Sequence, residues 1–141
     1  MNHIELLCHL IETPRYSREE SAAADLIEAY MKEHGLQVQR HGNNLWSIHP
    51  ATSGPTILLN AHIDTVRPVS AWTRDPHKAT IEGDYLYGLG SNDDGASLVS
   101  LLETFIACTG KTLPYTLILL LSAEEEVSGK AGVESVLPLL P

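Results

Sequence analysis

Residues 56–66 read TILLNAHIDTV and join a strand pattern to two side chains that can take part in metal chemistry. Three apolar residues, 57–59, follow a Gly-Pro pair, which is the pattern of a short buried strand. His62 and Asp64 come next, and on an extended backbone alternate side chains point the same way. A metal-binding histidine usually has its second ring nitrogen held by a carboxylate or carbonyl group. Asp64 is placed to do this for His62, although this pair alone also fits a surface histidine beside a turn aspartate.

A second apolar run, residues 117–121, is expected to form a central strand covered on both faces. The helix predicted between the two runs is long enough for a crossover, so the two strands should be parallel. Open α/β sheets bind ligands beyond the carboxyl ends of their strands. Residues 124–126, all glutamate, follow the second strand, and Asp93 stands just before the crossover helix. We therefore expect these acidic residues to meet His62 at one edge of the sheet.

The remaining pattern predicts an α/β fold with a mixed, largely parallel sheet flanked by helices. Residues 3–12 carry a helical apolar stripe that ends before Pro14. Residues 17–20, Ser-Arg-Glu-Glu, have the pattern of a capping box that opens a second helix. The further predicted elements are strands at 36–40 and 44–49, a hairpin of 79–82 and 85–87, and a helix after Gly95.

Composition limits the possible classes of function. The 141 residues can form one domain, and 43% hydrophobic with 19% charged residues is ordinary for a globular protein. The formal net charge of −9 argues against nucleic acid and anionic membranes as partners. Cys8 and Cys108 are interpreted as buried free thiols, which favours a reducing compartment. No signal peptide or membrane span is recognised, so we expect a cytoplasmic protein.

Imidazole and carboxylate ligands suit zinc, and a carboxylate that is not a ligand can take a proton from water. Two alternatives stay open at this point. Asp93 or Asp94 could only cap the following helix, and residues 124–126 could form a solvated acidic turn. The histidines without a partner carboxylate at a telling spacing are interpreted as structural or surface residues: His3, His9, His34, His41, His49 and His77.

Taken together, these clusters resemble the acetylornithine deacetylase, succinyl-diaminopimelate desuccinylase and carboxypeptidase family of dinuclear zinc amidohydrolases. Within it, the chain looks most like acetylornithine or succinylornithine deacylases. The Asn-Asp-Asp-Gly sequence at 92–95 is also similar to zinc aminopeptidases, a related fold with the same ligand order. The motifs that carry the resemblance are His62–Val66, Trp72 with Asp75-Pro76, Tyr87–Asp93 and Ala123–Glu126.

The resemblance implies a role for each of five residues. His62 would bind one zinc ion, Asp93 would bridge two, and Glu126 would bind the other. Glu125 would be the general base, and Asp64 would be the partner of His62. The implied cofactor is two zinc ions per active site, with cobalt as a substitute.

The resemblance also implies a cis peptide bond between Asp93 and Asp94. Residues 1–141 are expected to be the N-terminal part of the catalytic domain, without the lid domain, the C-terminal part and the remaining ligands. The expected activity is zinc-dependent hydrolysis of the amide bond of a small N-acyl amino acid, N-acetyl- or N-succinyl-ornithine, in arginine biosynthesis. The chain alone is expected to be inactive. The alternatives are a zinc aminopeptidase and a non-catalytic metal-binding or assembly module.

One expectation concerns self-association. The end of the chain is mostly apolar. Exposed apolar surface near Leu137, Leu139 and Leu140 should favour a homodimer or a looser self-association.

Overall fold

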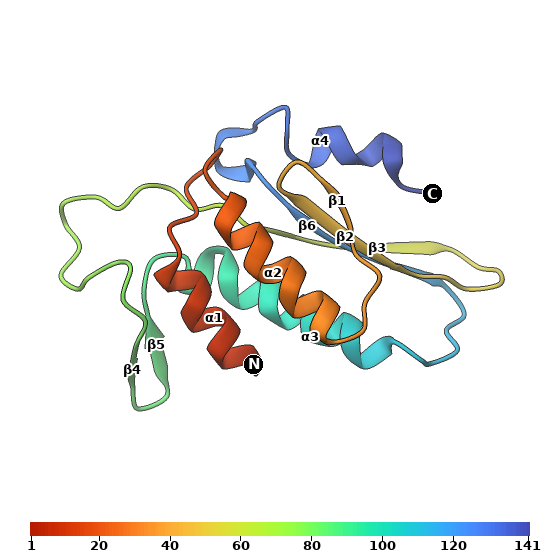
Figure 1. Cartoon of the computed structure of the whole chain (residues 1–141), viewed down its shortest axis with the longest axis horizontal. Coiled ribbons are helices and arrows are strands. Elements are labelled where there is room, and N and C mark those ends of the chain that lie inside the picture. The colour runs from red at the N-terminus through yellow and green to blue at the C-terminus, as the bar shows by residue number, and fades with distance from the viewer.

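A computed structural model describes all residues, 1–141, and shows one mixed sheet with three helices packed on one of its faces (Figure 1). A short fourth helix lies on the opposite face, and a separate hairpin stands apart from the sheet. The sheet order is β1 (Gln39–His41), β2 (Asn44–His49), β6 (Thr116–Ser122) and β3 (Thr56–His62). The helices are α1 (His3–Glu12), α2 (Ser21–Glu33), α3 (Ser97–Cys108) and α4 (Val133–Val136), and the hairpin is β4 (Thr80–Glu82) with β5 (Tyr85–Tyr87).

Strands β3 and β6 are parallel, as the crossover through α3 predicts, and the structure shows that they are also adjacent. Their register pairs Ile57 with Leu117 and His62 with Ser122, so both strands end at the same edge. The mixed α/β fold flanked by helices is confirmed. The expectation of a largely parallel sheet is wrong, because only β3–β6 is parallel, whereas β1–β2 and β2–β6 are antiparallel. The crossover sets only the relative direction of β3 and β6, and the direction of β2 follows from its pairing with β6.

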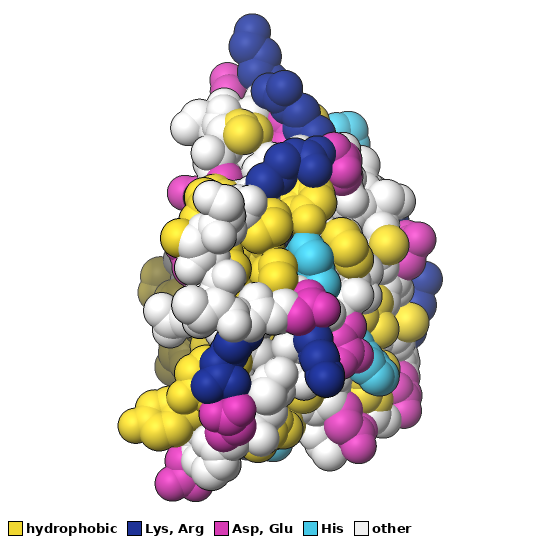
Figure 2. All heavy atoms as spheres, turned by 90° about the vertical axis from the view of Figure 1, so that its left-hand side faces the viewer, with side chains coloured by type: hydrophobic (Ala, Val, Ile, Leu, Met, Phe, Trp, Pro, Cys, Tyr) yellow, Lys and Arg dark blue, Asp and Glu magenta, His cyan; other side chains and the backbone are white.

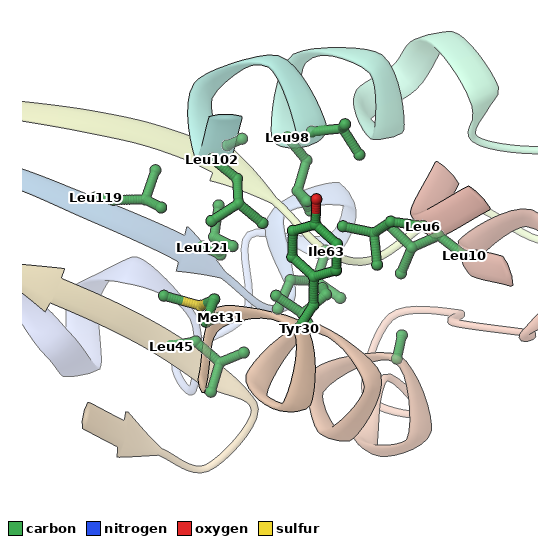
Figure 3. Packing of buried hydrophobic residues seen from close by; sticks show 14 of the residues in the cluster. Leu6, Leu10, Tyr30, Met31, Leu45, Ile63, Leu98, Leu102, Leu119 and Leu121 are labelled. Atoms are coloured by element: carbon green, nitrogen blue, oxygen red, sulfur yellow. The ribbon is translucent and has the colours of Figure 1, made fainter. Parts of the chain in front are cut away.

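The core explains why five successive residues of β6, Leu117–Leu121, are apolar. Leu119 and Leu121 point into the large cluster beneath the three helices, where Tyr30 and Leu102 meet them (Figure 3). Leu120 faces the other way and packs against Trp46 and Val136. A strand with both faces covered buries successive side chains, and each buried leucine contributes about 2 kcal/mol.

The start of α2 differs from the prediction. The helix begins at Ser21, with Glu20 at its N-cap position and no side-chain cap. The predicted capping box at residues 17–20 is wrong because the Ser17 hydroxyl donates instead to Asp64 Oδ2, at 2.6 Å. A hydrogen bond to an ionised carboxylate is stronger than one between neutral groups, so the tertiary partner takes this hydroxyl from the helix terminus.

The other elements lie close to their predicted positions, except that the first strand begins only at Gln39. Cys8 and Cys108 are free, but both are half-buried rather than buried. Leu137 and Leu139 are exposed as expected, whereas Leu140 is partly buried against the small cluster beside Trp46. No helix combines the length and the apolar character that crossing a membrane requires.

Candidate metal centre

Three side chains from distant parts of the chain meet at the edge where β3 and β6 end. His62 is the last residue of β3, Asp93 lies in the irregular turn η1 (Ser91–Ala96) before α3, and Glu126 lies in the short turn η2 (Glu125–Val127) after β6. One donor atom of each lies within 4.8 Å of the others. The expected convergence of the three residues is therefore observed.

The orientation of the His62 ring is set by the residue two positions further on. Its Nδ1 atom lies 3.0 Å from the backbone oxygen of Asp64 and 3.5 Å from the Asp64 carboxylate. Because Nδ1–H donates to this carbonyl oxygen, Nε2 is left to face Asp93 Oδ1 at 3.1 Å and Glu125 Oε2 at 3.7 Å. The sequence pattern predicts that the Asp64 side chain holds the His62 ring. In the structure the backbone oxygen of Asp64 lies closer to Nδ1 than the carboxylate does.

The Asp64 carboxylate holds the loop that carries the glutamates. It is completely buried and accepts the Ser17 hydroxyl, the Glu125 amide at 3.0 Å and the Glu126 amide at 3.1 Å. Burial by itself raises the pKa of Asp64, but the hydrogen bonds from His62, Ser17 and the two amides outweigh it and hold the pKa at about 2. Asp64 is therefore an ionised carboxylate inside the protein.

The charges at the site suit a cation. Burial lowers the pKa of His62, but hydrogen bonding to Asp64 and the negative charges of Asp64 and Asp94 raise it to about 9. Burial and then the charge of Asp93 raise the pKa of Glu126. A divalent ion among these donors would relieve the repulsion between the carboxylates, and one imidazole nitrogen with two carboxylates is a donor set that transition metals accept. The residues present fit a metal.

The capping alternative for Asp93 and Asp94 does not describe the structure. Helix α3 has Ala96 at its N-cap and no side-chain cap, so neither Asp93 nor Asp94 caps it. Instead, Asp94 Oδ2 accepts the backbone amide of His62 at 3.2 Å. The Asp93–Asp94 peptide is cis, as the resemblance implies.

His77 has a structural contact, as expected. Its Nε2 atom lies 2.6 Å from the Tyr16 hydroxyl, and it does not belong to the group of metal donors.

Sequence reasoning missed a buried cation beside the site. Arg15 is 1% exposed and donates hydrogen bonds to the backbone oxygens of Leu10, Ile63 and Gly90. It thereby joins the end of α1 to the loop after β3 and to the glycine-rich loop before Asp93. Burial lowers its pKa to about 10, against the opposing charges of nearby aspartates. The sequence around Arg15 gives no sign of its burial. Its three acceptors are backbone oxygens, which every residue type has, so no partner residue can be recognised in the sequence.

Two clefts border the segment that carries the paired glutamates. One, of about 280 Å³, is lined by Asn60, Ser122 and Glu125, and the other, of about 290 Å³, by Ser17, Arg67 and Glu126, among other residues. The side of the molecule at which β3 and β6 end carries intermingled acidic, basic and histidine side chains (Figure 2). A polar molecule of small size could thus reach the carboxylates of the paired glutamates.

The fold and the donor group define the class of protein: an α/β domain of the metallopeptidase type. The chain belongs to peptidase family M20/M25/M40, whose sequence profile matches residues 58–140. Among the curated relatives, the succinyl-diaminopimelate desuccinylase of Stenotrophomonas maltophilia is 32% identical over an alignment of 142 residues. The alignment covers 94% of this chain and 37% of that enzyme. The corresponding enzyme of Wolinella succinogenes is 29% identical over 136 residues, with coverages of 95% and 37%. The chain thus spans little more than a third of the length of these relatives.

Solved structures show the same fold. An M20 family metallo-carboxypeptidase from Sulfolobus solfataricus superposes with a TM-score of 0.76 at 23% identity, over 90% of this chain and 32% of that one. A dinuclear metal binding peptidase of the M20 family from Bacillus subtilis superposes with a TM-score of 0.72 at 20% identity, over 96% and 38% of the two chains.

Proposed function

We propose that this chain is the N-terminal part of the catalytic domain of a metal-dependent amidohydrolase that cleaves the amide bond of an N-acyl amino acid. One observation carries the proposal: His62 Nε2 shares a group of metal donors with Asp93 and Glu126, while Glu125 stands 3.7 Å from the same nitrogen and outside that group. Family membership and the desuccinylase relatives support it. The term full-length protein means the proposed longer protein of which this chain would be the N-terminal part.

Each residue would have a distinct part in the reaction. His62, Asp93 and Glu126 would hold the metal, with Asp93 shared between two ions. The bound metal would supply Lewis acidity toward the amide carbonyl and toward water. The Glu125 carboxylate, 59% exposed, would take a proton from the attacking water and pass it to the departing nitrogen. Asp64 would keep the ring of His62 and both glutamates in place.

Zinc is the narrower proposal for the metal. An imidazole with carboxylates suits zinc, and the Bacillus subtilis neighbour is a dinuclear metal binding peptidase. Cobalt, which accepts similar donors, is the substitute to compare. We propose that ligands outside residues 1–141 complete each site.

For the substrate, the relatives modify the expectation from the sequence. Those named above are succinyl-diaminopimelate desuccinylases, which favours a succinyl group and diaminopimelate over the ornithine expected from the motifs. A role in arginine biosynthesis depends on ornithine and has no support from these names. Ornithine and diaminopimelate are both small amino acids with a second amine. Their N-acyl derivatives can therefore be compared as substrates in one assay panel.

The test is hydrolysis by the full-length protein with added zinc or cobalt. The panel contains N-succinyl-diaminopimelate, N-succinylornithine, N-acetylornithine and an aminoacyl anilide with a free α-amino group. We expect turnover of an N-acyl amino acid, with the succinyl compounds preferred. Turnover of the anilide alone would make the protein an aminopeptidase. Metal binding without turnover of any compound would favour a non-catalytic metal-binding or assembly module.

The remaining expectations stay part of this proposal. The small N-acyl amino acid is the proposed partner, and we propose neither nucleic acid nor a membrane as one. A cytoplasmic location is expected from the sequence. Self-association through exposed Leu137 and Leu139, or along the exposed apolar residues Ile57 and Leu58 of edge strand β3, can be measured by sedimentation of the 141-residue chain.

A further inference from the structure

The segment Ala123–Glu126, which carries the paired glutamates, is held by side chains from elsewhere in the fold. The Ala123 amide donates to Asn44 Oδ1 at 2.9 Å, and the Glu124 amide donates to Glu20 Oε1 at 3.1 Å. The next two amides donate to Asp64. Four successive backbone N–H groups therefore find side-chain acceptors, and all three acceptor residues are completely buried.

The local conformation explains why such support is needed. Glu124 has φ +56° and Ser128 has φ +47°, the left-handed region that non-glycine residues rarely adopt. The side chain of Glu124 also fills the space beside Gly129, where an added Cβ atom would lie 1.8 Å from Glu124 Oε2. The local sequence does not favour this backbone, so contacts from other elements must maintain it.

Glu20 has the geometry of a support rather than of a reacting group. Its carboxylate accepts the Arg18 amide at 2.8 Å, the Asn43 side-chain amide at 3.1 Å and the Glu124 amide. It does not belong to the group of metal donors. Each of its hydrogen bonds comes from a backbone amide or a neutral side chain. The Glu20 carboxylate therefore serves to hold chain segments together.

Asn44 supports the same segment from the other side. Its side-chain nitrogen donates to the backbone oxygens of His41 at 3.0 Å and Ala131 at 2.7 Å, while its oxygen accepts the Ala123 amide. The side chain thus ties the β1–β2 turn to both ends of the loop that follows β6.

We propose that Glu20 and Asn44 are positioning residues, which together with Asp64 fix the backbone of Ala123–Glu126. A fixed backbone lets neighbouring side chains point at different targets, Glu125 at the reacting water and Glu126 at the metal. The inference rests on the proposed hydrolase function for its catalytic consequence. The holding of the backbone itself does not depend on that function.

The experiment compares Glu20→Ala, Glu20→Gln and Asn43→Ala. Glutamine keeps an oxygen that can accept the Arg18 and Glu124 amides, so Glu20→Gln should retain the loop. Its N–H group would face the Asn43 side-chain nitrogen, so this variant loses the Asn43 contact. Asn43→Ala removes a partner of Glu20 that does not touch the loop, and it is the matched control. Amide hydrogen exchange is measured on the 141-residue chain, and kcat and KM are measured on the full-length protein.

We expect Glu20→Ala to speed exchange at the amides of Glu124–Glu126 by about 10-fold or more while β6 stays protected. Turnover should fall through kcat, with KM changed little. Glu20→Gln and Asn43→Ala should stay within about 3-fold of the parent in both measurements. Asn44→Ala should speed exchange at the Ala123 amide in the same way.

Three results would overturn the inference. The first is unchanged exchange at Glu124–Glu126 in Glu20→Ala. The second is equal acceleration there and in β6, which would mean a general loss of stability. The third also applies if Glu20→Ala does not fold: loss of kcat in a folded Glu20→Gln with unchanged exchange at Glu124–Glu126 would show that Glu20 acts through its charge and not by holding the backbone. Absence of hydrolysis in the parent protein together with the expected exchange pattern would instead contradict the proposed function and leave the positioning role supported.

Discussion

The Nε2 atom of His62 lies 3.1 Å from Oδ1 of Asp93, although 31 positions of sequence separate the two residues. The contact links the end of β3 to the turn before α3, and Glu126 completes the group from the turn after β6. An imidazole nitrogen whose other ring position is already bonded can serve as a ligand without rearrangement. The predictions below test this arrangement and the framework beneath it.

The 141-residue chain alone should hold zinc weakly and show no hydrolysis. Zinc sites normally have three or four protein ligands, whereas here each of two ions would have one terminal ligand and a share of Asp93. Titration calorimetry with zinc, followed by assay on the substrate panel, measures both. Two tightly bound ions per chain with turnover would contradict the prediction, and would mean that residues such as Asp94 complete the site.

Glu125→Gln in the full-length protein should lower kcat by about 100- to 10,000-fold and leave the metal content largely intact. Glu126→Gln should lower the metal content, because it removes a donor. Glu33→Gln, on the exposed end of α2, is the control and should change neither. Metal analysis and steady-state kinetics on the same preparations separate the roles. Parallel loss of metal in Glu125→Gln would show that the base and the ligand are assigned the wrong way round.

Asp64 should make the metal-free chain sensitive to acid. Its pKa in the folded chain is about 2, lowered from an ordinary value of 3.8. A lowered carboxylate pKa contributes stability that is present above the unfolded-state value and is lost as the pH falls through the folded-state value. In the presence of a chelator, the free energy of unfolding should therefore drop by roughly 2 kcal/mol between these two pH values. Denaturant titrations at each pH measure it, and an Asp64→Asn variant with the same pH dependence would refute this assignment.

Removal of the Arg15 guanidinium should destabilise the chain strongly. Arg15→Met would remove the guanidinium donor from the backbone oxygens of Leu10 and Ile63, at a cost of about 3 kcal/mol. The oxygen of Gly90 would keep its second donor, the Gly95 amide. Arg74→Met, at an exposed ion pair with Glu82, is the matched control and should leave the denaturation midpoint unchanged. Equal midpoints for the two variants would mean that water replaces the guanidinium.

Gly90→Ala should be more damaging than Gly83→Ala. Both glycines have positive φ, +72° and +58°, so alanine strains the backbone at each, by about 1 kcal/mol. An added Cβ at Gly90 would also lie 2.5 Å from the Arg15 guanidinium and 2.6 Å from Thr65, whereas at Gly83 it would meet nothing within 4 Å. Thermal unfolding of both variants measures the difference, and similar shifts in Tm would argue against close packing around Arg15.

The meeting of His62, Asp93 and Glu126 could be predicted from the sequence. Apolar runs at 57–59 and 117–121 mark two strands, and the helix between them makes the strands parallel. Since parallel strands end at the same edge of a sheet, the residues that follow them are expected at that edge, and the adjacency of β3 and β6 in the structure makes them neighbours. The periodicity of apolar residues and the length of a crossover are properties of short stretches of chain. They can be recognised without knowing which distant residues are in contact.

The contacts that hold this site together were decided only by the tertiary structure. Ser17 bonds to Asp64 across 47 positions rather than capping α2, and Glu20 receives the Glu124 amide across 104 positions. Arg15 is buried because three backbone oxygens converge on it. A hydrogen bond between a side chain and a distant backbone atom has no period and no fixed spacing, and any residue type presents the same amide or carbonyl. For this reason the sequence alone identified the donor residues, while the residues that position them became visible only in the folded chain.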